Sequence, residues 1–188
     1  MANGRATMRF TVEQYHEMGR AGILSGDMRT ELIDGEVVMM SPVGPEHAAC
    51  VKRVTRLFHV RLGDRATVSV QDPVVLDAYW EPQPDVSLLA HRDDFYAAGH
   101  PEPSDILLAI EVADTTLKND REVKIPHYAA TGVRESWIVD LNGERVEVHR
   151  RPTKSGYRSI HRLGRGEKIS PLAFPDVSIS VNEILGAR

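Results

Sequence analysis

Cysteine is nearly absent from this sequence of 188 residues, in which Cys50 is the only one. A single cysteine cannot form an internal disulfide, and it excludes the clustered thiolates of zinc fingers. Such sparing use is typical of proteins of the reducing cytoplasm, where we expect this chain to be located. Any metal site must therefore be built from ligands other than thiolates.

Long apolar runs are also missing. The longest, at residues 105–113, is far shorter than the roughly 18 residues that a membrane-spanning helix needs. Residues 1–9 are not followed by the apolar stretch of a signal peptide, and no Gly-x-x-x-x-Gly-Lys-Ser/Thr loop for ATP phosphates occurs. We expect no membrane association, a disordered N-terminus over residues 1–9 and a single domain over residues 10–188.

An excess of positive charge is absent as well, because the formal net charge is −4. This balance excludes a protein that simply coats nucleic acid, since neutralising phosphates requires many Lys and Arg side chains. Residues 144–168 differ in charge from the chain as a whole, because they include eight basic and three acidic residues. This segment either meets a polyanion or forms a solvated hairpin face, and its sequence does not separate the two.

The hydrophobic content of 41% and charged content of 27% are those of a globular protein. Apolar periodicity, caps and turn residues predict helices at residues 12–24, 45–63 and 119–131. The dipeptides Asp34-Gly35 and Asn142-Gly143 predict hairpin turns. Strands are predicted on both sides of these turns and at residues 66–70, 73–77, 85–89, 106–112, 135–140, 144–149, 157–163 and 177–181.

Glu111 is out of place in its surroundings, because residues 106–112 otherwise form an apolar strand. Burying an ionised carboxylate costs several kcal/mol unless it is paired, protonated or bound to a cation. Asp85 opens the preceding strand, and neighbouring strands lie only about 5 Å apart, so the two carboxylates could meet. Two hard oxygen ligands suit Mg²⁺, with Mn²⁺ as a substitute, and leave coordination positions open for phosphodiester chemistry.

A series of motifs along the chain adds to this pair. They are Glu31-Leu32-Ile33-Asp34-Gly35-Glu36, Pro45-Glu46-His47, Pro84-Asp85-Val86, Ile110-Glu111-Val112, Lys124 with Tyr128, Gly132-Val133 and Ser136-Trp137-Ile138. Their order resembles the Uma-type family of restriction endonucleases, within the PD-(D/E)XK nuclease superfamily, over residues 10–150. The resemblance implies an α/β fold with a restriction-endonuclease-like core, in which helices flank a mixed central β-sheet and extra β-hairpins are added. It also implies Mg²⁺-dependent cleavage of DNA.

The resemblance assigns roles at matching positions. Asp85 and Glu111 stand at the two acidic positions of the superfamily, as catalytic residues and metal ligands. The lysine expected two places after the second is replaced here by Ala113. Lys124 stands at the place to which the family's lysine has moved, where it would balance the carboxylates and stabilise charge on the phosphate. Glu31 matches an early acidic residue that adds a ligand or orients water, although a hairpin carboxylate could equally face solvent.

Asp120, Lys124 and Tyr128 are spaced four apart and would share one helix face. The first two could instead form an ordinary surface ion pair. His47, in the first turn of its predicted helix, is either a general base, a phosphate contact or a solvated helix-end residue. Asp120, Tyr128 and His47 are weaker candidates than Asp85, Glu111, Lys124 and Glu31.

Two further polar residues have open roles. Gln71 could position water or a base, or simply make a hydrogen bond within a loop. Asp114, so close to Glu111 in sequence, could recruit a second cation or cap the next helix. No individual DNA-contacting residue is predicted.

Three functions fit these residues. The first is a metal-dependent endonuclease acting on DNA, expected as a homodimer because a two-fold axis places two sites on the two strands. The second is a catalytically inactive module that keeps the nuclease fold to bind DNA or to serve a structural role, since Ala113 replaces the expected lysine. The third is a phosphodiesterase acting on RNA or nucleotides, because the same carboxylates would serve any phosphodiester.

Overall fold

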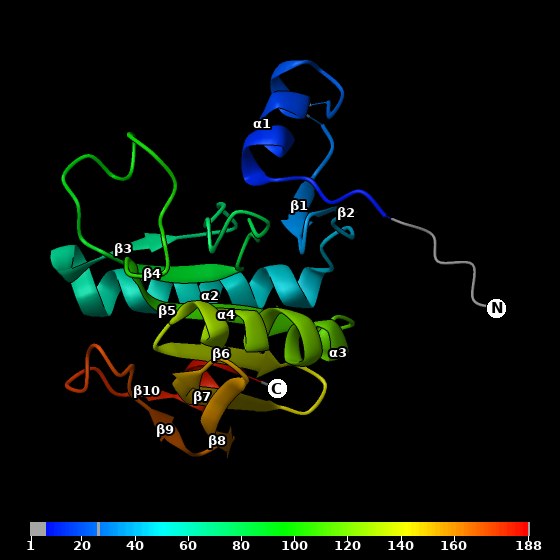
Figure 1. The fold of residues 1–188 in the computed structure, drawn as a ribbon. Helices are drawn as coiled ribbons and strands as arrows, with labels where there is room; N and C mark the ends of the chain where they lie inside the picture. Colours follow the sequence, from blue (N-terminus) through cyan, green and yellow to red (C-terminus); the bar gives the residue numbers. More distant parts are fainter. Residues whose placement is uncertain (1–6, 26, 188) are drawn as a thin grey trace.

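The computed structural model describes residues 7–25 and 27–187, and its centre is a six-stranded β-sheet (Figure 1). The strands follow the order β3 (Ala66–Ser69), β4 (Val86–Ala90), β5 (Ile106–Ala113), β6 (Glu135–Asp140), β7 (Arg145–Thr153) and β8 (Gly156–Gly164). Only β5 and β6 pair in parallel, and the other neighbours are antiparallel. The predicted mixed sheet is confirmed.

Helices cover both faces of the sheet, because β5 is apolar on both sides. On one face, α2 (Pro45–Leu62) and α5 (Val181–Leu185) share a core with Leu108, Ile110 and Val112 of β5. On the other, η2 (Asp120–Lys124) and α4 (Ile125–Thr131) follow α3 (Leu117–Asn119), and Ala109 and Ala113 pack there (Figure 1). Along β5, Glu111 alternates with Leu108, Ile110 and Val112, so its side chain points to the opposite face of the sheet, the one covered by η2 and α4.

An N-terminal unit projects from one end of the sheet (Figure 1). It consists of α1 (Val12–Arg20) and the hairpin of β1 (Thr30–Ile33) and β2 (Glu36–Met39), whose turn uses positive φ at Asp34 and Gly35. The predicted continuation of α1 to residue 24 is wrong. Gly22 adopts a φ of 70° and closes the helix with a hydrogen bond from its N–H to the Gly19 carbonyl.

The predicted strand at residues 73–77 is also wrong. This segment folds back on itself, because the N–H of Val74 donates to Pro82 and that of Leu76 to Trp80. Prolines at 73, 82 and 84 have no N–H for a β-ladder, so the stretch remains a loop. The loop is nevertheless buried in part, and it delivers its C-terminal end directly to β4.

The predicted strand at residues 177–181 is only partly right. A short strand β10 (Ile179–Ser180) pairs with β9 (Lys168–Ile169), and α5 then begins at Val181. Ser180 and Glu183 form a reciprocal capping box at the start of α5. This Ser-x-x-Glu spacing is visible in the sequence and could have predicted the helix.

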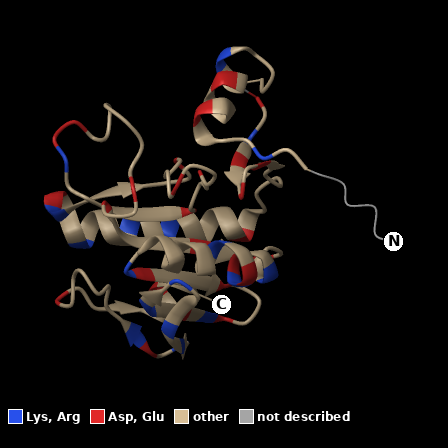
Figure 2. Cartoon of the chain, viewed as in Figure 1, with Lys and Arg blue, Asp and Glu red and all other residues tan. Residues whose placement is uncertain are grey.

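Three of the eight basic residues at 144–168, namely Arg145, Arg150 and Arg162, pair with buried carboxylates. Arg162 lies opposite Glu147 across β7 and β8 and donates to it at 2.9 Å, while Arg121 donates to the same carboxylate at 2.7 and 3.0 Å. Arg150 pairs similarly with Glu135. Figure 2 shows acidic and basic segments side by side on these strands. Part of the positive charge of this segment therefore stabilises the sheet and is not free for a polyanion.

Replacing Glu147 with Gln is expected to lower the free energy of unfolding by about 1–3 kcal/mol at pH 7, because its arginines lose their partner. Burial acts to raise the pKa of Glu147, but hydrogen bonds from Arg121 and Arg162 outweigh it and lower that pKa. A lowered pKa gives stability that is present above the unfolded-state pKa of about 4.3 and is lost as pH falls through the folded-state pKa. Urea unfolding at pH 7 and pH 3 measures both effects, with the exposed Glu36→Gln as control. An equal stability difference at both pH values would contradict this account.

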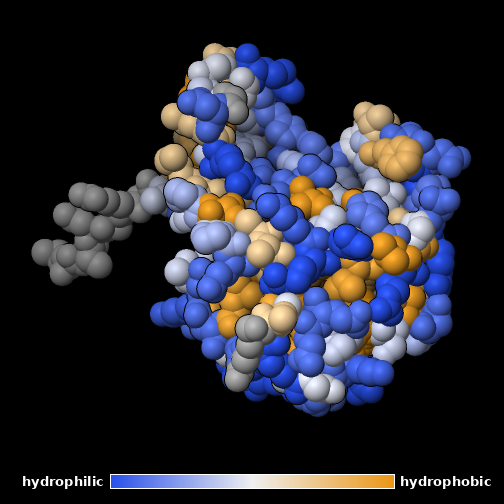
Figure 3. Space-filling model, turned by 180° about the vertical axis from the view of Figure 1, so that it is seen from behind, coloured by the Kyte–Doolittle hydropathy of each residue, from blue (hydrophilic) through white to orange (hydrophobic). Residues whose placement is uncertain are grey.

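The surface is mixed in character. Figure 3 shows that hydrophobic residues reach the rear face as patches among hydrophilic side chains. Among the described residues, no helix has both the length and the apolar character needed to cross a membrane. The expected disorder of residues 1–9 lies mostly outside the described residues, and the extent of a single domain over residues 10–188 stays a prediction.

Candidate active site

Asp85 and Glu111 come together at one end of the sheet. In the antiparallel register of β4 and β5, Val86 pairs with Ile110, so Asp85, just before β4, stands opposite Glu111. The N–H of Val112 also donates to the Asp85 carboxylate at 2.8 Å. The two strands therefore hold both carboxylates at neighbouring positions, as their place in the sequence led us to expect.

Asp85 is held by three donors from three segments. His47 Nε2, in α2, lies 3.0 Å from Asp85 Oδ2, and Gln71 Nε2 donates to Oδ1 at 3.0 Å. Burial acts to raise the pKa of Asp85, but the hydrogen bonds from His47, Val112 and Gln71 outweigh it and lower that pKa. Asp85 is therefore ionised at neutral pH, and both weaker candidates, His47 and Gln71, lie against it.

The contact with Asp85 also changes the pKa of His47. Its hydrogen bond to Asp85 raises the pKa of the imidazole, although burial opposes the shift. Its Nδ1 atom is buried and has no hydrogen-bond partner within the described residues. His47 is thus not the solvated helix-end residue that its sequence position allowed.

Glu111 is almost fully buried, with 3% of its surface exposed. The Tyr128 hydroxyl donates to Glu111 Oε1 at 2.7 Å, and Lys124 Nζ lies 3.7 Å from the same oxygen. Burial raises the pKa of Glu111 well above its usual range, with Lys124 opposing the shift and neighbouring carboxylates adding to it. Burial therefore favours the protonated form of Glu111, while the ammonium of Lys124 favours the ionised form.

Lys124 and Glu31 meet inside the protein and not at its surface. Lys124 Nζ lies 2.9 Å from Glu31 Oε2, and both side chains are more than 90% buried. Burial acts to lower the pKa of Lys124, but Glu111 and Glu31 outweigh it and raise that pKa. A surface ion pair of Lys124 with Asp120 and a solvent-facing Glu31 are both excluded by this geometry.

A π-helical turn sets the position of Asp120 and Lys124. The N–H of Ile125 donates to the Asp120 carbonyl, five residues back, and Pro126 then has no N–H to continue an α-helical ladder. Both side chains are buried, and Asp120 accepts a hydrogen bond from Thr116 at 2.7 Å. Burial raises the pKa of Asp120 to about 6. The predicted helix start at residue 119 is wrong, since helix begins at Leu117.

These groups border one cleft of about 430 Å³. Glu31, Asp85, Glu111 and Asp120 all contribute to its lining, and Lys124 is the one lysine among the described residues that line it. If every carboxylate were ionised, the group would carry a charge of −3 in a poorly solvated place. Such a surplus of hard oxygen ligands fits a divalent cation of the Mg²⁺ type.

Asp114 lies at the rim of this cleft and is half-buried. Asn142 Nδ2 lies 2.7 Å from its carbonyl and 3.4 Å from its carboxylate. Asp114 does not cap the next helix, because Thr116 occupies the N-cap of α3. Asn142 therefore fixes this carboxylate at the edge of the cleft.

Gln83 supports the site but was not predicted from the sequence. Its N–H donates to Glu31 at 3.2 Å and its side-chain amide donates to the Thr30 carbonyl at 2.9 Å. These bonds join the loop before Asp85 to β1, and so they hold Glu31 beside Lys124. The only signal was its place between Pro82 and Pro84, which by itself does not indicate a role.

Comparisons with known proteins bear on the family and the fold of this chain. A search of curated proteins found no match. A solved structure from Anabaena variabilis, described as a "putative nuclease belonging to DUF820", superposes with a TM-score of 0.72 at 14% identity, covering 94% of this chain and 97% of the other. That likeness confirms the nuclease-type fold. A family model described as "Putative restriction endonuclease" matches residues 12–182, and the chain therefore belongs to the Uma2 family.

Proposed function

We propose that this chain is a nuclease that hydrolyses DNA phosphodiester bonds with Mg²⁺, for which Mn²⁺ can substitute. The observation that carries the proposal is the meeting of Asp85, Glu111 and Lys124 in one buried cleft. The family description and the similar nuclease-type structure support the same reaction class. Substitution of Ala113 for the superfamily lysine does not weaken it, because Lys124 Nζ approaches Glu111 from η2.

Asp85 and Glu111 are the proposed ligands, and Glu31 is positioned to orient a water or to add a third oxygen. A bound divalent cation would polarise a phosphate oxygen and lower the pKa of a bound water so that hydroxide forms at neutral pH. The raised pKa of Glu111 supports this assignment, since a cation would replace the proton that burial otherwise favours.

Lys124 is the proposed stabiliser of negative charge on the phosphate. Its raised pKa keeps it charged throughout the neutral pH range, and its ion pair with Glu31 fixes the ammonium in place. A fixed charge needs little reorganisation during the reaction, which is why such groups act strongly in a dry cleft. Tyr128 has a positioning role, because its hydroxyl holds one oxygen of Glu111.

His47 is proposed to contact the phosphate and not to act as a general base. Its hydrogen bond to Asp85 favours the protonated imidazole, which cannot accept a proton from water. As a cation, it would add positive charge beside the metal ligands and attract the DNA backbone.

Cleavage of both strands of a duplex would require two such clefts, so we propose that the chain acts as a two-fold homodimer on DNA. Light scattering would then give about twice the chain mass of 20.9 kDa. A monomer that cuts only one strand would overturn the dimer and leave the reaction unchanged.

The test of the function is cleavage of supercoiled plasmid in Mg²⁺, Mn²⁺ or EDTA, with single-stranded DNA and RNA as parallel substrates. Nicked or linear plasmid should form with either cation and disappear in EDTA, and the Glu111→Gln variant, purified identically, controls for contaminating nuclease. Cleavage restricted to RNA would move the function to an RNA phosphodiesterase. DNA binding without cleavage on any substrate would instead identify an inactive nuclease-fold module.

A further inference from the structure

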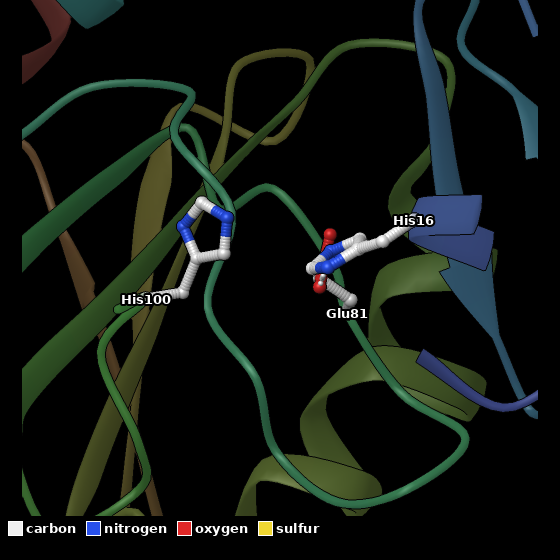
Figure 4. Close-up of side chains that lie close together, drawn as sticks. All are labelled: His16, Glu81 and His100. Carbon is white, nitrogen blue, oxygen red and sulfur yellow. Dashed lines mark hydrogen bonds and ion pairs between the residues drawn. The ribbon is translucent and has the colours of Figure 1, made fainter. Parts of the chain in front are cut away.

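A second group of metal-ligating side chains lies outside the proposed active site. His16, Glu81 and His100 each offer one ligand atom, and these atoms all lie within 4.8 Å of one another. Figure 4 shows His16 reaching from α1 toward Glu81, with His100 on a separate segment at the opposite side. None of the three borders the cleft of Asp85 and Glu111.

The geometry is close to that of a bound ion. Ligand atoms about 2.0–2.1 Å from a tetrahedral metal lie about 3.3 Å apart. His16 Nε2 and Glu81 Oε2 are now 2.7 Å apart, as a direct hydrogen-bonded pair, and would separate slightly around an ion. His100 is exposed, so its ring can rotate into place without disturbing the core.

The environment of Glu81 supports an additional cation. Its carboxylate side chain is only 4% exposed, and His16 is the one side chain that bonds to it among the described residues. The outer side of the group is open, because His16 is one-third exposed and His100 lies at the surface, so an ion and its water ligands can enter.

We propose that His16, Glu81 and His100 form a binding site for a first-row divalent transition ion such as Zn²⁺. Two imidazoles and one carboxylate are the ligand set that such ions prefer, whereas Mg²⁺ prefers oxygen ligands alone. The site is therefore chemically distinct from the cleft of Asp85 and Glu111, and its occupancy does not depend on the proposed nuclease reaction.

The ion would join three segments that are far apart in the sequence. His16 belongs to α1, Glu81 to the loop before β4, and His100 to the loop before β5. The backbone of Glu81 pairs with Leu32 in β1 through two hydrogen bonds of 2.8 and 3.2 Å. Because Leu32 follows Glu31, the ion would fix the loop and the strand that carries Glu31, and its role is structural support of the N-terminal unit.

The experiment uses the full chain, stripped of metal with a chelator and titrated with Zn²⁺ by calorimetry and thermal unfolding. One high-affinity ion per chain is expected, with a rise in Tm of about 5–10 °C at 100-fold excess over Kd. Co²⁺ in place of Zn²⁺ should give the visible absorption of a tetrahedral or five-coordinate site. His100→Ala should lower Zn²⁺ affinity about 100-fold or more and leave the metal-free Tm unchanged, because His100 is exposed.

Two control variants locate the binding. His161→Ala removes an exposed histidine on β8, and Asp85→Ala removes a ligand of the proposed active site. Both variants should keep the full Zn²⁺ affinity. Unchanged affinity in Asp85→Ala would show that Zn²⁺ binds outside the proposed active site, even if no nuclease activity is found. Zn²⁺ binding that survives His100→Ala and is lost in Asp85→Ala would overturn the proposal, as would the absence of any Zn²⁺-dependent rise in Tm.

Discussion

Replacing Glu111 with Gln is expected to lower metal-dependent cleavage by at least about 1,000-fold, which corresponds to about 4 kcal/mol of activation free energy. Gln keeps the size of the side chain and an oxygen that can accept the 2.7 Å hydrogen bond from Tyr128. It removes the negative charge that would hold the cation opposite Asp85. Metal binding and cleavage should therefore fall together.

Plasmid cleavage measures the loss of activity in Glu111→Gln, and calorimetric titration with Mg²⁺ measures the loss of metal affinity. Glu122→Gln is the matched control, because this exposed glutamate lies in η2 and forms only a surface pair with Lys118. A Glu111→Gln variant with more than a tenth of native activity would show that Glu111 is not a required ligand. Retained Mg²⁺ affinity without cleavage would instead give Glu111 a role after metal binding.

The same substitution should not destabilise the metal-free protein. The folded-state pKa of Glu111 lies well above its usual range, so the folded chain keeps a proton that the unfolded chain releases at lower pH. Stability of the metal-free native protein therefore falls as pH rises from the unfolded-state pKa toward the folded-state pKa. Gln has no such titration, so the variant should be as stable as the native chain at pH 5 and more stable at pH 8.

The position of Glu111 shows which parts of the site can be predicted from sequence. A single carboxylate within an apolar strand has to find a compensating partner, and Asp85 starts a strand that is adjacent in the chain. Sequential strands are usually neighbours in a sheet, so the pair follows from local pattern and a general rule of topology. The roles of both residues remain proposals.

Other contacts depend on distant or irregular segments. Glu31 meets Lys124 where Gln83 joins β1 to the loop before β4, and no periodicity describes that loop. In the π-helical turn at Asp120 the backbone hydrogen bond reaches one residue further back than in an α-helix, and a single turn is too short to set a hydrophobic period of its own. The resemblance to a family placed Lys124 near the carboxylates where spacing alone allowed a surface ion pair.

The two errors in the predicted strands have a common cause. β-branched residues at 74 and 75 suggest a strand, but the prolines around them remove the hydrogen-bond donors that a ladder requires. At residues 177–181 the β-like composition concealed the capping box of Ser180 and Glu183. In both segments, the groups that donate or accept backbone hydrogen bonds decide the structure, and the composition does not.

Replacing Lys124 with Met is expected to lower the free energy of unfolding by about 3–5 kcal/mol at pH 8, because it leaves buried carboxylates without a counter-charge. Glu31 loses a partner at 2.9 Å and Glu111 one at 3.7 Å. The raised pKa of Lys124 means that its contribution is present throughout the neutral range and is lost only at strongly alkaline pH. The native chain should therefore keep the full contribution of Lys124 to its free energy of unfolding at pH 8.

The loss in Lys124→Met should shrink at pH 5. Removing the ammonium raises the pKa of Glu111 and Asp120 further, so both carboxylates take up protons at lower pH and their repulsion disappears. Urea unfolding at the two pH values measures the change, and Lys118→Met, at an exposed position in α3, is the control. A loss of equal size at pH 5 and pH 8 would assign the effect to packing and not to charge.

Saturating Mg²⁺ separates the two roles of Lys124. A cation placed between Asp85 and Glu111 supplies the missing positive charge, so it should restore much of the stability of Lys124→Met at pH 8. Cleavage should nevertheless stay low, because the ammonium that would stabilise charge on the phosphate is still absent. Recovery of both stability and cleavage would mean that Lys124 only balances the carboxylates, while recovery of stability alone would establish its action on the phosphate.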